Sequence, residues 1–305
     1  MRPRHHVACI GSANLDHVLE LDVLPAGEGK QLARGSRWSG GGLAATAAVA
    51  VSSLEGRATW CGLTGDDRNG LTLTHMLMEA GVELCEEAVV SGARTPVAAV
   101  LVDPAGRRWL GWHAGEGLET TAVSPQLPDF AAVDAVLADA WSVSLSTTAF
   151  RQALAHGIPR VLDWELADPS TAFELAELAD HVIFSAAGLV TFIGIGDVDA
   201  ALRATADRLP ETVVAVSLGP EGSAWVTEDG VVRLPAPRVP AHDTTGCGDV
   251  FHGAYALGIG EGMPVPQAAT FATAAAALKA ERGNGWSGMP DRSSTESLMA
   301  RIQWA

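Results

Sequence analysis

The sequence predicts an α/β fold in which a mainly parallel sheet is covered by helices on both faces. Apolar, β-rich stretches alternate with helix-like stretches along most of the chain, and this alternation is typical of such a sheet. The 305 residues suffice for one large α/β domain or two smaller ones. Hydrophobic residues make up 48% of the chain and can fill a sizeable core.

The predicted elements follow one another as strands and helices in turn. The first four are a strand at Val7–Ile10, a helix of small residues at Leu43–Leu54, a strand at Ala58–Leu63 and a helix at Leu71–Ala80 that Gly81 ends. The later strands are Ala135–Ala138, Val161–Trp164, Val182–Phe184 and Val213–Leu218. The later helices are Thr147–His156, Thr171–Ala179, Val198–Leu209 and Ala268–Ala280. Ligands of such sheets bind beyond the carboxyl ends of the strands.

Two segments, roughly 15–40 and 93–118, interrupt this alternation. The second contains the apolar run Pro96–Val102, a turn at Asp103–Gly106 and the run Arg107–His113. Two strand-like runs joined by a short turn predict a hairpin rather than a strand followed by a helix.

The segment Asp243–Asp249, with the sequence DTTGCGD, precedes a helix-like run. Gly246 and Gly248 allow several backbone N–H groups to converge on an anion, which the start of a helix also attracts. Asp249 lies beside that anion site and could take a proton from an attacking hydroxyl, as phosphoryl transfer requires. The alternative is a helix cap in which Asp249 only complements the helix dipole.

Composition excludes several classes of function. Twenty Lys and Arg residues stand against 36 Asp and Glu, and the net charge of −16 argues against nonspecific binding of nucleic acid or anionic membranes. The four cysteines have neither metal-ligand spacing nor the density of a disulfide scaffold, so Cys9, Cys61 and Cys85 are predicted as core residues. No apolar run approaches the ~20 residues of a membrane span, and we expect a soluble, cytoplasmic protein.

Several motifs together resemble the ribokinase-like (PfkB) carbohydrate kinases over nearly the whole chain. Residues 40–47 (GGGLAATA) resemble the first signature of that family, and DTTGCGD resembles the second. Residues 11–16 and 62–67 fit in order and spacing. The resemblance implies a single ribokinase-like domain over residues 1–305, a three-layer α/β/α sandwich, with a β-lid formed by 15–40 and 93–118. It also implies ATP and Mg²⁺ as cofactors, a homodimer through the lid and, as in some relatives, a monovalent cation held by backbone carbonyls near DTTGCGD.

The resemblance also assigns roles to individual residues. Asp249 is the catalytic base, and the anion hole is made by Gly246, Cys247 and Gly248. The acceptor-binding residues are Asp16, Asn14, Lys30, Gly40, Gly41 and Gly42. The nucleotide-binding residues are Ser217, Gly219, Gly222, Thr244 and Asn284, although the glycines of residues 217–222 alone would equally indicate an ordinary turn. No metal ligand is assigned.

Three positions depart from the family pattern. Ala45 stands where the first signature usually has Asn, and Ser185–Gly188 stands where the family has an Asn-x-x-Glu motif near the metal. Cys247 stands where Ala is more common. A thiol at a helix start is expected to have a lowered pKa and to be open to oxidation or alkylation. The alternative is a small, inert, buried side chain.

Within the family, several segments resemble the sulfofructose kinase branch, in which Lys30 lines up with a lysine near the sulfonate. Trp112 and Trp141 stand where that branch has polar or basic partners, and they suit a neutral sugar or an aromatic aglycone better than a sulfonate. The predicted function is an ATP-dependent kinase that phosphorylates a primary hydroxyl of a fructose-, ribose- or sulfofructose-like sugar. The alternatives are a nucleoside kinase of the same fold and a sugar or nucleotide sensor without turnover.

Overall fold

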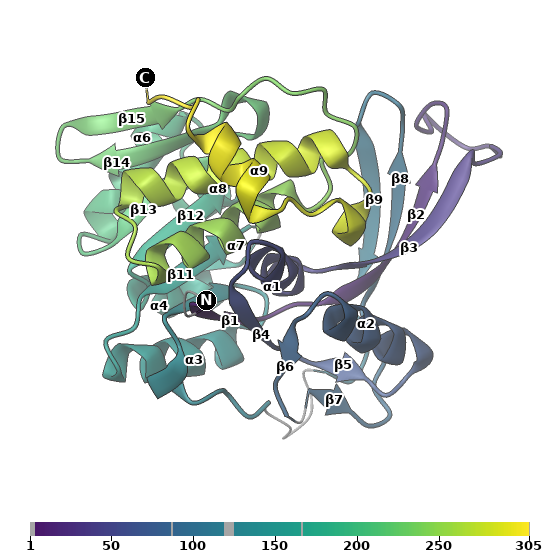
Figure 1. The fold of residues 1–305 in the computed structure, drawn as a ribbon, viewed down its shortest axis with the longest axis horizontal. Coiled ribbons are helices and arrows are strands. Elements are labelled where there is room, and N and C mark those ends of the chain that lie inside the picture. Colours follow the sequence, from purple (N-terminus) through teal and green to yellow (C-terminus); the bar gives the residue numbers. More distant parts are fainter. Residues whose placement is uncertain (1–3, 87, 119–124, 166, 305) are drawn as a thin grey trace.

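The computed structural model describes residues 4–86, 88–118, 125–165 and 167–304 (Figure 1). In this part of the chain the main sheet has nine strands, ordered β15-β14-β13-β12-β11-β10-β1-β4-β6. Their bounds are β1 His6–Ile10, β4 Arg57–Cys61, β6 Glu83–Leu84, β10 Ala135–Asp139, β11 Arg160–Trp164, β12 His181–Ser185, β13 Val213–Ser217, β14 Ser223–Thr227 and β15 Gly230–Leu234. All neighbours pair in parallel except β13–β14 and β14–β15, which are antiparallel.

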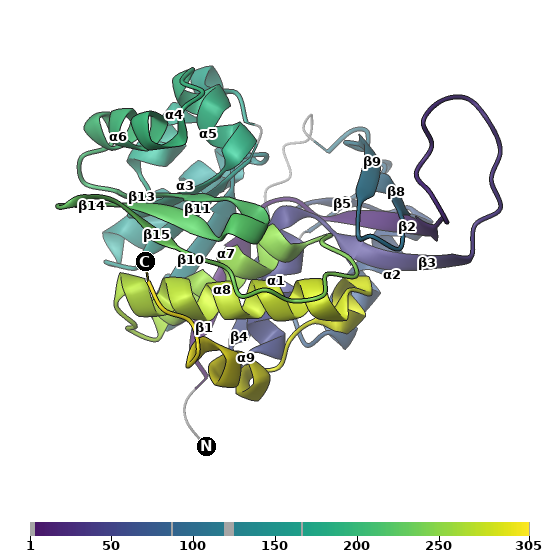
Figure 2. The ribbon, with the colours of Figure 1, turned by 90° about the horizontal axis from the view of Figure 1, so that it is seen from above.

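Helices cover both faces of this sheet (Figure 2). One face carries α1 (Leu43–Ser53), α7 (Cys247–Gly260) and α8 (Val265–Arg282), with α2 (Arg68–Glu79) and α9 (Arg292–Met299) beside them. The other carries α3 (Val143–Ala155), α4 (Pro169–Glu177), α5 (Ala186–Ile193) and α6 (Val198–Arg208). Since successive strand residues point to opposite faces, Val7 and Cys9 enter one core while Ala8 and Ile10 enter the other. The predicted three-layer α/β/α architecture is therefore confirmed.

A second sheet stands beside the main one, in the order β3-β2-β8-β9 (Figure 1). Its strands are β2 (Asn14–Glu20), β3 (Gly35–Gly41), β8 (Val97–Val102) and β9 (Arg108–His113). They fall in the two segments that interrupt the alternation, and β8 and β9 pair antiparallel as a hairpin. The strands β5 (Thr64–Gly65) and β7 (Val89–Val90) pair in parallel as a separate two-stranded sheet.

The observed elements differ from the prediction mainly at their ends. Helix α2 begins at Arg68 because Asp67 caps it, its side chain accepting from the N–H of Gly70. Helix α3 begins at Val143, four residues before the predicted start. The antiparallel strands β14 and β15 and the helix α5 were not predicted.

The cysteines predicted as core residues are buried, but two of them form a disulfide that was not predicted. Cys61 and Cys85 are both buried but are joined in a disulfide, with Cα atoms 5.0 Å apart. The two residues are brought together because β4, which ends at Cys61, pairs with β6, which is followed by Cys85. Nothing local to either residue signals that pairing. Cys9 is a free, buried core residue as predicted.

Candidate active site

A cavity of about 1040 Å³ lies between the second sheet and the start of α7. It receives residues from separate parts of the chain: the connection from β1 to β2, the start of α1, residues 141–148, Glu165, the segment 243–249 and the end of α8 with the turn that follows. Of the predicted site residues, those that line it are Asn14, Asp16, Gly40, Gly41, Gly42, Gly246, Gly248 and Asp249.

The second sheet forms one wall of this cavity through alternate residues. In β9, Arg108, Leu110 and Trp112 line the cavity, whereas Trp109 is absent from the lining and 58% exposed. The same alternation in β2 places Asn14 and Asp16 on the cavity side. Trp112 meets Trp141 of the main domain, with ring centroids 5.2 Å apart.

Helix α7 starts inside DTTGCGD. Gly246 is its N-cap in the left-handed conformation, at φ 77°, so the chain turns sharply before the first helical N–H groups. Gly246 and Gly248 line the cavity, and Asp249 reaches it from the first helical turn. The buried hydroxyl of Thr245, which also borders the cavity, finds no hydrogen-bond partner in the described chain. A helix start with an unsatisfied hydroxyl beside it suits an anion that accepts hydrogen bonds.

The cavity floor is strongly acidic. Burial raises the pKa of Asp249 well above its usual range, and the negative charges of Glu165, Asp16 and Asp139 act in the same direction, while Arg108 opposes them. Burial also raises the pKa of Glu165. Excess negative charge of this kind would be relieved by a divalent cation, so the residues fit Mg²⁺ brought by a nucleotide. No group of three or more His, Cys, Asp or Glu side chains in the described residues could hold a metal alone.

Asp16 lies across the cavity from this floor. Its side chain is 6% exposed and accepts a hydrogen bond from the side-chain amide of Asn14. Burial raises its pKa to about 7. A Cβ atom at Gly41 would come within 2.6 Å of an Asp16 oxygen, so only glycine leaves the carboxylate room there. Asp16 can therefore accept hydrogen bonds from a ligand close to the backbone of Gly41.

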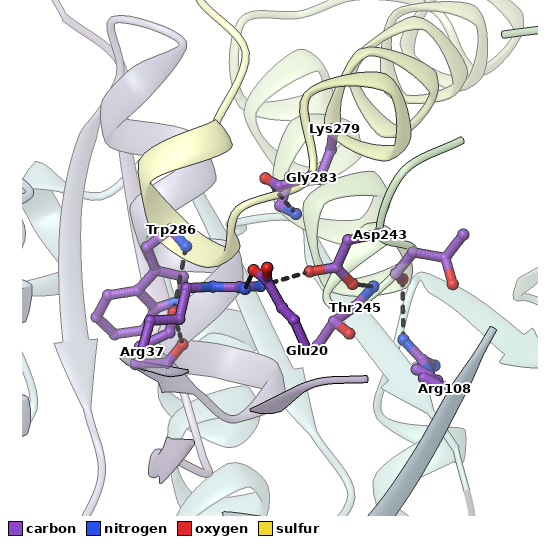
Figure 3. Close-up of polar contacts among 11 residues, drawn as sticks. Glu20, Arg37, Arg108, Asp243, Thr245, Lys279, Gly283 and Trp286 are labelled. Atoms are coloured by element: carbon purple, nitrogen blue, oxygen red, sulfur yellow. Dashed lines mark hydrogen bonds and ion pairs between the residues drawn. The ribbon is translucent and has the colours of Figure 1, made fainter. Parts of the chain in front are cut away.

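Two arginines join the second sheet to DTTGCGD (Figure 3). Arg37 of β3 donates to the carboxylate of Asp243 at 2.9 Å and to that of Glu20 at 2.7 Å. Arg108 of β9 donates to the carbonyl oxygen of Thr244 at 2.9 Å. Asp243 in turn accepts from the N–H of Thr245 at 2.9 Å. Residues 243–249, the candidate anion-binding turn, are thus held from the side of the second sheet.

Sequence reasoning assigned no role to several cavity residues. Trp286 donates from its indole to the hydroxyl of Thr46 at 3.0 Å, and its ring would meet a Cβ atom placed on Gly40. Arg37, Glu165, Thr245 and Lys279 also line the cavity. Glu165 directly follows the predicted strand Val161–Trp164, and Lys279 lies at the end of the predicted helix Ala268–Ala280. Neither position reveals where the side chain points.

Lys30 is not brought to the cavity. It is exposed in the connection between β2 and β3. The register pairs Asn14 with Gly41 and Glu20 with Gly35, so this connection lies at the end of the two strands opposite to the cavity residues. Figure 2 shows the connection extending away from the rest of the molecule.

The predicted nucleotide residues also lie outside the cavity lining; they are Ser217, Gly219, Gly222, Thr244 and Asn284. Ser217 ends β13 in register with Ser185 of β12, so both stand at the carboxyl edge of the sheet. The hydroxyl of Ser185 caps α5 by accepting from the N–H of Gly188 at 3.0 Å. Where the family has an Asn-x-x-Glu motif, this chain therefore has a helix cap.

The predicted lowering of the Cys247 pKa is wrong. Cys247 is the first residue of α7 but does not line the cavity. Burial raises the pKa of its thiol to about 11 and outweighs the opposing charges of Lys279 and Arg108. The thiol is therefore protonated at neutral pH.

Comparison with known proteins identifies the family. Residues 4–292 match the model described as pfkB family carbohydrate kinase. This chain belongs to the pfkB family. The pfkB chain is 31% identical over 284 residues to the ATP-dependent ribose-1-phosphate kinase of Halopiger xanaduensis, covering 90% of this chain and 92% of that protein. It is 27% identical over 262 residues to a fructokinase of Klebsiella pneumoniae, covering 80% and 83%.

Solved structures agree with this assignment. A crystal structure from Agrobacterium tumefaciens, of a protein provisionally called a ribokinase, superposes with a TM-score of 0.92 at 33% identity and covers 98% of both chains. The ribokinase of Arabidopsis thaliana, complexed with ribose and ATP, superposes with a TM-score of 0.78 at 24% identity, which shows the ribokinase-like fold, and covers 97% of this chain and 98% of its own. The pfkB chain is a phosphotransferase that acts on sugars. No helix in its described residues could cross a membrane.

Proposed function

We propose that this pfkB kinase transfers the γ-phosphate of ATP, with Mg²⁺, to a primary hydroxyl of a small sugar or sugar derivative. The observation that carries the proposal is the shared cavity of Asp16 and Asp249, one on the second sheet and one at the start of α7. Asp16 and the backbone at Gly40–Gly42 orient the acceptor. Asp249 removes the proton of its hydroxyl, and its raised pKa suits a base.

The phosphoryl group lies at the N-terminus of α7, where Gly246, Gly248 and Thr245 supply donors. ATP extends from there along the carboxyl edge of the sheet toward Ser217–Gly222, with Thr244 and Asn284 beside it. Glu165 lines the same cavity and raises the pKa of Asp249, so it would be the acidic group nearest to the base that could hold a water bound to Mg²⁺. The magnesium ion neutralises charge on the phosphates when it is bound.

The second sheet serves as a lid that excludes water and positions the hydroxyl, which limits hydrolysis of ATP. Arg37 and Arg108 hold it against DTTGCGD. Acceptor candidates are fructose-, ribose- and sulfofructose-like sugars and, from the relative in Halopiger xanaduensis, ribose 1-phosphate. The position of Lys30, far from the cavity residues of β2 and β3, disfavours its use for a sulfonate.

A nucleoside is the second candidate acceptor, and the pair Trp112 and Trp141 favours it. Both rings line the cavity and are 43% exposed, so a flat base could stack on either of them. A sugar would use the same surface through its C–H face. Nucleoside and sugar acceptors would therefore contact the same wall of the cavity.

The deciding experiment measures ATP consumption with Mg²⁺ against ribose, fructose, sulfofructose, ribose 1-phosphate and ribonucleosides. The variant Asp249→Asn should lower kcat by about 10²- to 10⁴-fold with little change in acceptor KM. Asp229→Asn, in the exposed turn between β14 and β15, is the matched control and should behave as the native protein. Binding of ATP without turnover of any acceptor would instead support a sensor.

We also propose a homodimer through the lid. The face of the second sheet away from the cavity exposes Trp38 and Trp109, at 52% and 58%, and Trp38 stacks on His17 with ring centroids 4.3 Å apart. A second copy would cover these rings. Sedimentation should show a dimer for the native chain and a monomer for Trp109→Glu, whereas Leu154→Glu on α3 should leave the dimer intact. A native monomer at every concentration would contradict this proposal.

A further inference from the structure

Lys279 is a buried cation at the cavity. The sequence has two lysines, and only Lys30 is exposed; the side chain of Lys279, in the last turn of α8, is 1% exposed. Burial of a lone ammonium is costly unless neighbouring groups compensate its charge. Lysine is seldom fully buried without such a partner. Groups that compensate the charge of Lys279 are therefore expected around it.

The surroundings of Lys279 are the candidate anion-binding turn. The end of α8 lies directly against it, because the N–H of His242 donates to the carbonyl oxygen of Ala280 at 2.9 Å. The Lys279 ammonium donates to the carbonyl oxygen of Gly283 at 3.2 Å (Figure 3). An ammonium has three N–H donors, and this carbonyl is the one acceptor found for it in the described chain. Lys279 also lines the cavity, together with Gly246 and Gly248.

Two carboxylates, Asp243 and Asp249, act on Lys279 electrostatically. Burial lowers the pKa of Lys279 and Arg37 acts in the same direction, while Asp243 and Asp249 act to raise it. Asp243 is itself shared with Arg37 and with the N–H of Thr245. A positive charge at Lys279 thus compensates the carboxylates of Asp243 and Asp249, which flank the two glycines at the start of α7. A phosphoryl group would bind at that helix start.

A dissolved monovalent cation does not fit the same place. Such an ion would need backbone carbonyl oxygens near DTTGCGD, and the Gly283 oxygen already accepts from Lys279. Two cations side by side would also repel each other in a buried site. The residues present therefore do not fit the monovalent cation that the resemblance to some relatives implied.

We propose that the Lys279 ammonium is the resident monovalent cation of this kinase, holding residues 243–249 and 283 in their phosphate-binding arrangement, so that activity needs no added K⁺ or NH₄⁺. Lys279 is a positioning residue: it acts through the turn and through the carboxylates that it compensates. The inference rests on the proposed kinase function and adds to it how the anion site is kept in place.

The test compares turnover of Mg·ATP in tetramethylammonium buffer with turnover after addition of K⁺ or NH₄⁺. The native protein should change less than about twofold, since its cation is covalently attached. Lys279→Ala should lose about 10- to 100-fold in kcat/KM without these ions, because a charged hydrogen bond is removed. Added K⁺ or NH₄⁺ should restore much of this loss, as the ions fill the space that the ammonium leaves. Lys279→Met should lose as much without restoration, because its side chain fills that space.

Arg282→Ala is the matched control. Arg282 lies on the same helix, but its partners are Asp291, Ser294 and the carbonyl oxygen of Met289. Its loss should show no restoration by K⁺ or NH₄⁺. If K⁺ or NH₄⁺ restores turnover in Lys279→Ala but not in Arg282→Ala, the ion replaces the lost charge of Lys279. General damage to the fold would not be repaired in one variant alone.

Two outcomes would overturn the proposal: strong activation of the native protein by K⁺, or native-like activity of Lys279→Ala in tetramethylammonium buffer. If Lys279→Ala does not fold, the response of the native protein decides alone. If no acceptor is turned over, the same ion series is applied to binding of Mg·ADP by calorimetry. That measurement tests Lys279 even where the proposed kinase function fails.

Discussion

Arg108 of β9 donates a hydrogen bond of 2.9 Å to the carbonyl oxygen of Thr244, a residue 136 positions later in the chain. The contact joins the second sheet to the turn from which α7 starts. The guanidinium charge of Arg108 also lowers the pKa of Asp16, Glu165 and Asp249, which lie on different elements of the cavity. One side chain of the second sheet therefore acts on carboxylates that three different parts of the chain bring to the cavity.

Replacing Arg108 with Met should lower kcat/KM by roughly tenfold, because a charge-assisted hydrogen bond is lost. It should also move the acid limb of the pH–rate profile to higher pH, since removal of the positive charge raises the pKa of Asp249 further. Arg107→Met is the control: Arg107 pairs with Asp103 in the hairpin turn, and its side chain is 67% exposed. An unchanged acid limb in Arg108→Met would contradict the electrostatic part of this prediction.

Acceptor affinity should depend on pH through Asp16. Burial raises its pKa to about 7, Asp243 adds to that shift, and Asn14, Arg108 and Arg37 oppose it. The carboxylate accepts two hydroxyl hydrogen bonds only when deprotonated, so binding of a neutral sugar should strengthen as pH rises from 6 to about 8. Calorimetric titration checks this. In Asp16→Asn the pH dependence should vanish and affinity should fall roughly 10- to 100-fold.

Cys247 should not behave as a reactive thiol. Its raised pKa of about 11 leaves almost no thiolate at neutral pH. Iodoacetamide at pH 7.5 should therefore leave activity unchanged over an hour, and Cys247→Ala should keep kcat within about twofold of the native value. Rapid inactivation of the native chain, absent in Cys247→Ala, would show that the thiol is deprotonated in solution.

The choice between sugar and nucleoside acceptors should follow Trp112. Trp112→Ala removes one ring of the Trp112–Trp141 pair, whose centroids lie 5.2 Å apart. For an acceptor whose base stacks there, KM should rise by about 5- to 100-fold, or ~1–3 kcal/mol. For a free sugar the rise should be smaller, because less flat surface is buried. Trp112→Phe should recover most of the loss if stacking is the cause.

Six strands of the main sheet, β1, β4 and β10 to β13, could be predicted from the sequence because each is marked locally, whereas β6, β14 and β15 could not. Val161–Trp164 and Val182–Phe184 are short apolar runs between helix-like stretches, and both are buried strands in parallel register. The hairpin at residues 97–113 was marked by its turn at Asp103–Gly106. Helix α5 was not predicted: Ser185–Gly188 stands where the family has an Asn-x-x-Glu motif, and Ser185 serves instead as the cap of that helix.

The motifs at residues 40–47 and 243–249 determined the family and the candidate base, since glycine and aspartate at those spacings carry their chemistry in local backbone geometry. Which charged side chains complete the cavity was decided only by the tertiary structure. Arg37 lies on β3, Arg108 on β9 and Lys279 at the end of α8, and none has a local signature. The fold places these side chains around one turn. Burial there raises the pKa of Cys247 and lowers the pKa of Lys279, because loss of water disfavours the charged form of each group.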